Sequence, residues 1–348
     1  MKKYLMLIMF ACTFLFGQQN LDKRYKEIAG RYGGNDGICL FEDGNYMLYG
    51  YATAIFGTYT FEKDYINFYP DQQELFMIFG NQNPTIGNSA RMFFSGFERD
   101  GTAVQFDQEK PQAVFNDDAN CFASPYVYET KTKPTQIILS DLAEGTFYQT
   151  KFLIPKDYND LAIVHNKPSR YEKNFTGMVK SKGHSKILNI SMYDRDFTKS
   201  SEDENDNNWK EILEMKSEYY QAKESNKTGV FFNKHYHNFP TPENSAYSLD
   251  KKTYQFISKN AKDNEAYFRN DQYNDNRYLR KYIKVAGQPF VDKAFNKNSI
   301  STKSLFFTTC DEGSEKSYKY NGFIEYEDKS EPKELLQTTI VAPLPPLN

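Results

Sequence analysis

The sequence is poor in the residues that most often build catalytic and metal sites. Its 348 residues include only four Cys, four His and a single Trp. It has no glycine-rich loop of the P-loop or dinucleotide-binding type, so the common phosphate-cradling signatures are excluded. None of the cysteines lies in a local pattern typical of a Cys–His enzyme. The sequence therefore carries no catalytic signature that points to a reaction.

Beyond its N-terminus the chain also lacks a long apolar run. A mean hydropathy of -0.74 with 26% charged residues excludes a multi-spanning membrane protein. At the N-terminus, two lysines precede the apolar stretch 4–16, and Gly17 lies in position for cleavage before Gln18. This order is typical of a secretory signal peptide and is too short for a membrane span. We therefore expect residues 1–17 to be removed and the mature protein to be secreted, periplasmic or at the cell surface, without a stable membrane span.

A strong charge of one sign is missing as well. Without the two lysines of the signal peptide, 41 basic and 46 acidic residues leave a formal charge of -5. Binding to nucleic acid needs clustered cations that displace counterions, and this balance does not indicate them. We expect no nucleic-acid partner.

Aromatic residues other than tryptophan are abundant, with 27 Tyr and 29 Phe. Both types favour half-buried pleated surfaces, so their number favours a sheet-rich protein. The stretch 37–106 consists of short strand-like segments separated by turn residues. Within it, Asp43-Gly44 between two apolar runs predicts a hairpin with a type I′ turn. With further predicted strands up to residue 154, the total is roughly nine or ten strands. This number of short strands over such a length is typical of an antiparallel sandwich or barrel.

The length suits two domains of about 100–200 residues each. Near Pro155 the composition shifts toward Lys, Asn and Asp, and helical patterns begin. We therefore predict an α+β fold that is predominantly antiparallel β. An N-terminal β meander, forming a sandwich or barrel, would occupy 18–155, and an α+β domain would occupy 156–341. The proline-rich tail 342–348 is expected to be extended.

Two helices are predicted in the second domain. The acidic stretch 200–208 is expected to be a solvated loop without fixed structure. After it, Asn208 can cap a helix in which Trp209 and Ile212 begin an apolar stripe. A second helix is predicted over 275–286, where apolar residues recur at helical spacing and a glycine and a proline follow.

Three cysteines remain once the signal peptide is removed. An exported protein reaches an oxidising compartment, where a disulfide can form. Cys39 with Cys121 is the predicted pair, because both lie in the N-terminal domain, and Cys310 would then be left over. The alternative is three separate buried thiols that pack as small hydrophobic residues.

A metal site is predicted at His235 and His237. These residues are two apart in a segment expected to be a strand, which would place both imidazoles on one face. Zinc would need a further ligand from the fold, such as His165, His184 or a carboxylate. The alternative is a pair of surface or packed histidines.

A calcium loop is a second cofactor hypothesis, for residues 203–214. Oxygen-bearing side chains occur there at the spacing of a helix–loop–helix site. Two departures weaken the pattern, because Asn208 replaces the turn glycine and Lys210 occupies the usual apolar position. The alternative is a solvated acidic loop. The residues that fit the spacing are Asp203, Asn205, Asn207, Glu211 and Glu214.

The predicted function is that of an exported, non-enzymatic protein that acts by binding or by envelope interactions. Tyr and Phe exposed on a sheet make platforms for glycans or protein partners, although the same rings can instead fill the core. The alternative is an extracellular hydrolase, metal-dependent through His235 and His237, with its site between the two domains. Asp194 and Asp196 also form an acid pair of the kind that glycosidases use.

Overall fold

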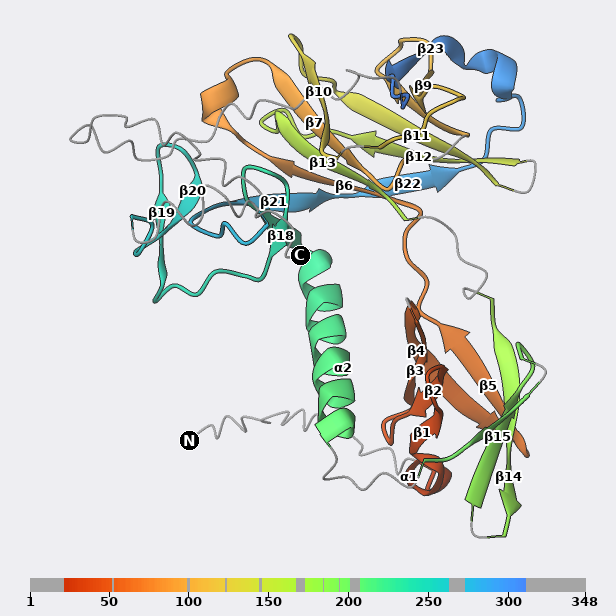
Figure 1. The fold of residues 1–348 in the computed structure, drawn as a ribbon. Coiled ribbons are helices and arrows are strands. Elements are labelled where there is room, and N and C mark those ends of the chain that lie inside the picture. The colour runs from red at the N-terminus through yellow and green to blue at the C-terminus, as the bar shows by residue number, and fades with distance from the viewer. Residues whose placement is uncertain are drawn as a thin grey trace, which may run out of the picture. The chain divides into compact units, whose positions relative to one another are not determined.

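The computed structural model describes residues 22–51, 53–98, 101–122, 124–143, 146–166, 173–183, 185–193, 195–200, 207–262 and 273–310 (Figure 1). The chain divides into two compact units. The first contains the chain up to Leu75 together with Asn166–Glu224, and the second contains Phe76–His165 together with the chain from Ser225. The observed division therefore differs from the predicted boundary at residue 155, which falls inside the second unit. Each unit is described separately below.

The structure is mostly antiparallel β, as predicted. In the first unit eight strands form one sheet whose two edges meet, since Tyr32 in the first strand forms a bridge with Lys199 beyond the last. The sheet is therefore nearly closed and barrel-like. In spatial order the strands are β1 (Gly30–Gly33), β2 (Gly37–Leu40), β3 (Asn45–Gly50), β4 (Thr53–Glu62), β5 (Tyr65–Pro70), β14 (Phe175–Lys182), β15 (Ser185–Ile190) and β16 (Asp196–Thr198).

Aromatic rings fill the inside of this sheet. Successive residues of a strand face opposite sides, so every second side chain of β3 to β5 points inward. Tyr46, Tyr59 and Phe68 are at most 1% exposed, and the Tyr46 and Phe68 rings lie edge to face with centroids 5.1 Å apart. The Tyr59 hydroxyl donates to the Phe41 carbonyl oxygen at 2.8 Å, so its polar atom is satisfied. The rings of these strands therefore fill the core, which was the alternative to exposed platforms.

The hairpin between β2 and β3 forms where Asp43-Gly44 predicted it, but its turn is different. Only Gly44, with φ of 80°, has a positive φ, whereas a type I′ turn needs positive φ at both central residues. The Gly44 N–H donates to the Phe41 carbonyl oxygen, and the Asp43 carboxylate accepts from the Asn45 N–H. The aspartate thus stabilises the turn through a hydrogen bond of its side chain, while its backbone stays outside the left-handed region.

Helix α2 (Asn207–Asn226) packs on the outer face of β2, β3 and β4, and the short helix α1 (Arg24–Ile28) precedes β1 (Figure 1). The helix after the acidic stretch is thus confirmed, although Asn208 lies within it rather than capping it. Phe56 of β4 stacks on Tyr219 with ring centroids 4.1 Å apart. The Phe41 and Trp209 ring centroids are 5.8 Å apart. Among the described helices, none combines the length and apolarity that a membrane crossing requires.

Polar contacts hold the C-terminal half of α2 to the sheet. The Tyr219 hydroxyl donates to Asp71 at 2.9 Å, and the Lys223 amino group pairs with the same carboxylate at 2.7 Å. The Tyr220 hydroxyl donates to the Asn45 side chain at 3.0 Å. Ring stacking and polar contacts together hold this half of α2 against the sheet.

The described strands of the second unit form two sheets. One runs β10 (Tyr126–Thr130), β7 (Ala90–Ser95), β13 (Asp160–His165), β6 (Phe76–Asn81), β21 (Tyr278–Val285), β17 (Gly229–Phe232) and β18 (Asn238–Phe239). In addition, β20 (Gln255–Ser258) pairs with β21, and β19 (Tyr247–Asp250) pairs with β20. The other runs β22 (Gly287–Phe290), β12 (Thr146–Leu153), β11 (Gln136–Ala143), β8 (Thr102–Phe106), β9 (Gln112–Phe115) and β23 (Ser301–Phe306). Two pairs are parallel, β7 with β13 and β9 with β23. Single-turn 3₁₀ helices occupy Pro84–Ile86 and Lys297–Ser299.

The predicted helix over 275–286 is wrong, because this segment forms β21. The strand lies between β6 and β17 and is buried on both faces near its start, where Tyr278, Leu279 and Arg280 are all at most 6% exposed. A strand buried on both faces loses the alternation of apolar and polar residues, so its apolar positions can also match helical spacing.

The predicted Cys39–Cys121 disulfide is also wrong. Cys121 is bonded to Cys310, with Cα atoms 5.1 Å apart, whereas Cys39 is buried under α2 in the first unit. Pairing of β9 with β23 brings the two bonded cysteines together, and the Thr308 hydroxyl donates to the Cys121 carbonyl oxygen at 3.1 Å. The prediction placed Cys39 and Cys121 in one N-terminal domain, whereas they belong to different units.

Replacing Phe56 by alanine should loosen α2 from the sheet. Phe56 is 4% exposed, and losing a buried phenylalanine side chain costs about 3–5 kcal/mol. Urea unfolding followed by the emission of Trp209, the single tryptophan, would measure this loss in the first unit. As a control, Tyr51→Ala changes a fully exposed ring and should shift stability by less than about 0.5 kcal/mol. Equal midpoints for the two variants would contradict this account of the helix contact.

Candidate ligand pocket and buried polar network

His235 and His237 lie on a turn between β17 and β18, not on the expected strand. The Asn233 side-chain oxygen accepts from the N–H groups of His235 at 2.8 Å and His237 at 3.0 Å. Between them Tyr236 has φ of 62°, so the segment is not a regular extended strand. The two rings are 6.4 Å apart, and His237 packs on Tyr273 at 4.2 Å. Burial lowers the pKa of His237.

The zinc hypothesis stays a prediction. In the described ranges no group of three His, Cys, Asp or Glu side chains is placed to hold a metal ion. His165, one of the suggested further ligands, has both ring nitrogens engaged, with Gly96 O at 2.9 Å and an Asp141 oxygen at 3.1 Å. His184, like Asp194 of the acid pair, lies outside the described residues.

The described half of the proposed calcium loop is helical. Helix α2 begins at Asn207, so Glu211 and Glu214 project from a helix instead of wrapping around one ion. Asp203 and Asn205 lie outside the described residues. Residues 207–214 of the predicted calcium loop 203–214 therefore belong to helix α2.

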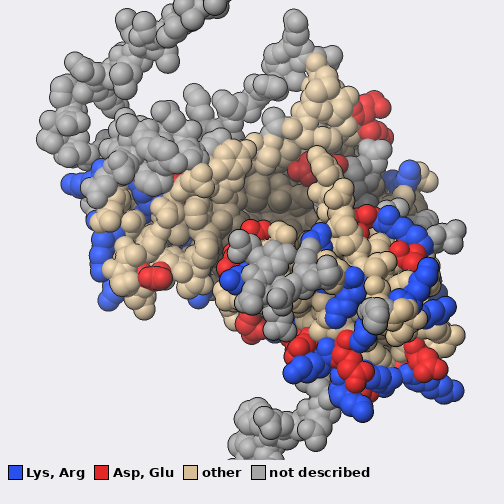
Figure 2. Space-filling view, turned by 60° about the horizontal axis from the view of Figure 1, so that its bottom comes forward, with Lys and Arg blue, Asp and Glu red and all other residues tan. Residues whose placement is uncertain are grey.

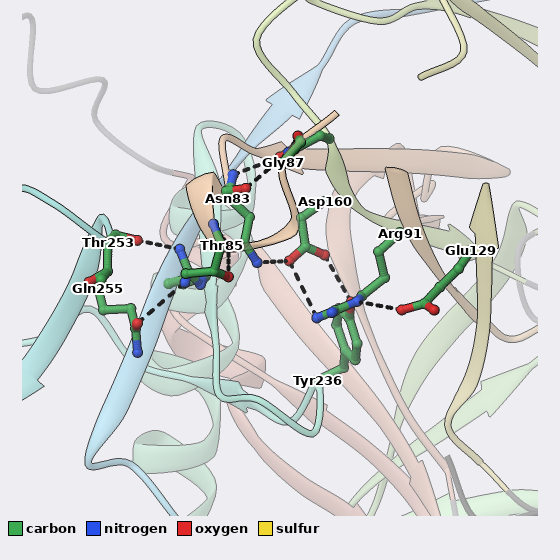
Figure 3. Close-up of polar contacts among 11 residues, drawn as sticks. Asn83, Thr85, Gly87, Arg91, Glu129, Asp160, Tyr236, Thr253 and Gln255 are labelled. Carbon is green, nitrogen blue, oxygen red and sulfur yellow. Dashed lines mark hydrogen bonds and ion pairs between the residues drawn. The ribbon is translucent and has the colours of Figure 1, made fainter. Parts of the chain in front are cut away.

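A buried polar network, which the sequence did not predict, lies in the second unit (Figure 3). At its centre, the Asp160 carboxylate accepts from the Asn83 amide at 2.7 Å and from the Tyr236 hydroxyl at 2.8 Å. The Arg91 guanidinium lies 4.0 Å from Asp160 and donates to Glu129 at 3.3 Å. Asp160 is fully buried and Arg91 is 1% exposed. Burial raises the pKa of Tyr236 well above its usual value, so this hydroxyl stays a proton donor.

The network joins segments that are distant in the sequence. Asp160 is the first residue of β13 and pairs with Arg91, the second residue of the neighbouring β7, while Asn83 and Tyr236 come from turns. The only signal in the sequence is that each charged residue directly precedes an apolar run. Because the carboxylate is fully buried, we interpret the network as a structural element rather than a reaction centre.

Replacing Asp160 by alanine should destabilise the second unit by about 3–5 kcal/mol, because the Arg91 charge would stay buried without its central partner. Urea unfolding monitored by far-UV circular dichroism measures the change. Glu129→Gln is the matched control, since the Glu129 side chain is 49% exposed and such a pair is worth about 0–1 kcal/mol. If the two substitutions cost the same, Asp160 is not the centre of the network.

A pocket of about 670 Å³ opens in the first unit beside the N-terminal half of α2. Its aromatic wall consists of Phe41 and Trp209, and Leu213 extends that wall. Pockets of this size are typical of small-molecule sites. The side chains of Lys26, Arg31, Lys199 and Lys216 also line it, together with Glu42 and Asp43.

The cations of the pocket differ in their partners. Lys216 pairs with Asp43 at 2.6 Å and lies 4.3 Å from the centroid of the Phe41 ring. Lys199 is half-buried, and its amino group has no ion-pair or hydrogen-bond partner within the described residues. Burial lowers the pKa of Lys199, and the nearby Lys186 lowers it further. The pocket thus contains a half-buried amine that an anion could neutralise.

Gly30 makes room for Lys199. Its φ of 136° is rarely adopted by other residues, and a Cβ atom there would lie 2.6 Å from the Lys199 side chain. The bridge between Tyr32 and Lys199 closes the sheet at the same place. The closure of the sheet therefore positions the amine at the pocket.

Comparisons with protein-family models, curated proteins and solved structures found no match for this chain. Inferences about its function therefore rest on its geometry and chemistry.

On the face shown in Figure 2, Lys and Arg lie intermingled with Asp and Glu. The formal charge of the whole chain is only -3. With no general excess of one sign on that face, attraction of an acidic ligand would have to come from local groups such as Lys199.

Proposed function

We propose that the protein is an exported, non-enzymatic binding protein that takes an acidic ligand in the pocket beside Trp209. The observation that carries this proposal is that the half-buried Lys199 lines a pocket with an aromatic wall. The proposal of export rests on the N-terminal stretch 4–16, which lies outside the described residues.

The pocket supplies two kinds of attraction. A cation held partly away from water is stabilised by an anion, and hydrogen bonds to charged groups contribute more than neutral ones. The Trp209 and Phe41 rings offer apolar area to the rest of the ligand, including the apolar face of a sugar ring. An acidic glycan unit and an acid with an apolar chain would each match this combination.

Titration with glucuronate and octanoate, compared with glucose and octanol, tests for an acidic ligand. At least one acid should change the emission of Trp209, which reports on this pocket because it is the only tryptophan. The uncharged compound of the same pair should bind at least tenfold more weakly, because it cannot pair with Lys199.

Substitution of Lys199 provides the matched control. Lys199→Met keeps an apolar stem but removes the charge, so acid binding should weaken about tenfold, equivalent to about 1.4 kcal/mol. Lys180→Met, at an exposed position of β14, should leave acid binding unchanged. Equal affinities of acids and uncharged compounds, or equal effects of the two substitutions, would refute the proposal.

Acid binding should also weaken at high pH. The ligand carboxylate is ionised above about pH 5, and Lys199 is cationic only below its pKa, which is lowered from the usual value. Affinity should therefore fall as the pH rises through this lowered pKa, before ordinary lysines titrate. Trp209 titrations between about pH 7 and 10 measure the effect.

Lys199→Arg serves as the control for this pH dependence, because arginine stays charged throughout that range. The variant should keep acid binding nearly constant with pH. A decline of the same size in Lys199→Arg would show that another group is responsible.

A further inference from the structure

Helix α2 has a hollow on each side of its N-terminal half. The 670 Å³ pocket lies along the edge formed by Trp209, Leu213 and Lys216. A second hollow of about 500 Å³ lies along the neighbouring edge, which includes Ile212 and Met215. Residues three, four and seven apart share one side of a helix, so these two sets mark two adjacent edges. The two hollows border the same segment of helix.

The second hollow differs in chemistry from the first. Its walls include aliphatic and thioether groups from Met47, Ala54, Ile212 and Met215. The other lining residues are Arg31, Tyr49, Gly50, Thr53, Asn208 and Glu211. No lysine lines it. Methionine adapts its shape to apolar guests, so these walls suit a hydrocarbon chain.

Arg31 lines both hollows and marks where they approach each other. Its guanidinium donates to the Tyr49 hydroxyl at 3.0 Å and to the Gly34 carbonyl oxygen at 2.7 Å. It also lies 5.3 Å from the centroid of the Tyr49 ring. These contacts hold the side chain in place, so a ligand can extend past it without having to order it first.

We propose that the ligand is an amphipathic acid with a single carboxylate and a hydrocarbon chain. The carboxylate lies beside Lys199 in the first hollow, and the chain passes Arg31 to reach the second. This inference rests on the proposed function, because it requires the acid site at Lys199.

The second hollow favours a hydrocarbon chain over an extended acidic glycan. Glu211 lines this hollow, so a repeating acidic polymer would bring like charges together there. A hydrocarbon chain carries no charge and gains free energy by leaving water. The inside of the barrel-like sheet is not an alternative place for the chain, because Tyr46, Tyr59 and Phe68 fill it.

A series of straight-chain carboxylates tests the proposal. Trp209 emission would be titrated with hexanoate, octanoate and decanoate below their micelle-forming concentrations. Each added CH₂ group that becomes buried should tighten binding about threefold to fourfold. The matching alcohols should bind more weakly than the acids but show the same dependence on length.

Filling the second hollow should abolish this dependence. Ala54→Phe places a ring at an exposed strand position that lines the hollow, so decanoate should bind no more tightly than hexanoate. Thr60→Phe is the matched control, since Thr60 is exposed on the same strand and lines neither hollow. This control should keep the dependence on chain length.

The outcomes separate the two proposals. If acids of all lengths bind with equal affinity and Lys199→Met weakens each of them, the amphipathic ligand is refuted while the acid site stands. An unchanged length dependence in Ala54→Phe would also refute the amphipathic ligand. If glucuronate binds and no straight-chain carboxylate does, the ligand is an acidic sugar instead. If no acid alters Trp209 emission, both proposals fail.

Discussion

The contact between α2 and the outer face of the barrel-like sheet is the interaction on which the candidate site depends. The C-terminal half of the helix is held to the sheet by the stacking of Phe56 on Tyr219. The Tyr219 hydroxyl and the Lys223 amino group also contact the Asp71 carboxylate. Toward the N-terminus, Trp209 packs on Phe41 at the longer distance of 5.8 Å. The helix is therefore held closely at one end and leaves hollows beside the other. A pocket with an aromatic wall follows from this uneven packing.

The second unit depends on a different constraint, the placement of charges inside a sheet core. A buried carboxylate or guanidinium is tolerated only when partners replace its lost hydration. The partners of Asp160 are Asn83, Tyr236 and Arg91. Asn83 and Tyr236 each lie on a turn, and Arg91 lies on the neighbouring strand. The network thereby ties distant segments together. Tyr236 takes part from a turn with a left-handed backbone, so the flanking histidines do not belong to a regular strand.

Local patterns in the sequence predicted a large part of the fold. Short strands were expected throughout 37–106, and β2 to β8 lie there. The helix after the acidic stretch also follows from its apolar stripe. Prediction failed for β21, where burial on both faces removed the alternation that distinguishes a strand from a helix. It failed as well for the disulfide, since the pairing of Cys121 with Cys310 could not be read from spacing alone.

The sequence by itself determined where strands and α2 form, because alternation, turn residues and helical spacing act between residues a few positions apart. It also determined that the inward rings would be tyrosine and phenylalanine. Only the tertiary structure decided that Cys121 meets Cys310, that Asp160 meets Tyr236, and that Lys199 and Trp209 line one pocket. These pairs depend on how strands associate and on how the chain divides between two units. Such long-range contacts leave no local pattern in a single sequence.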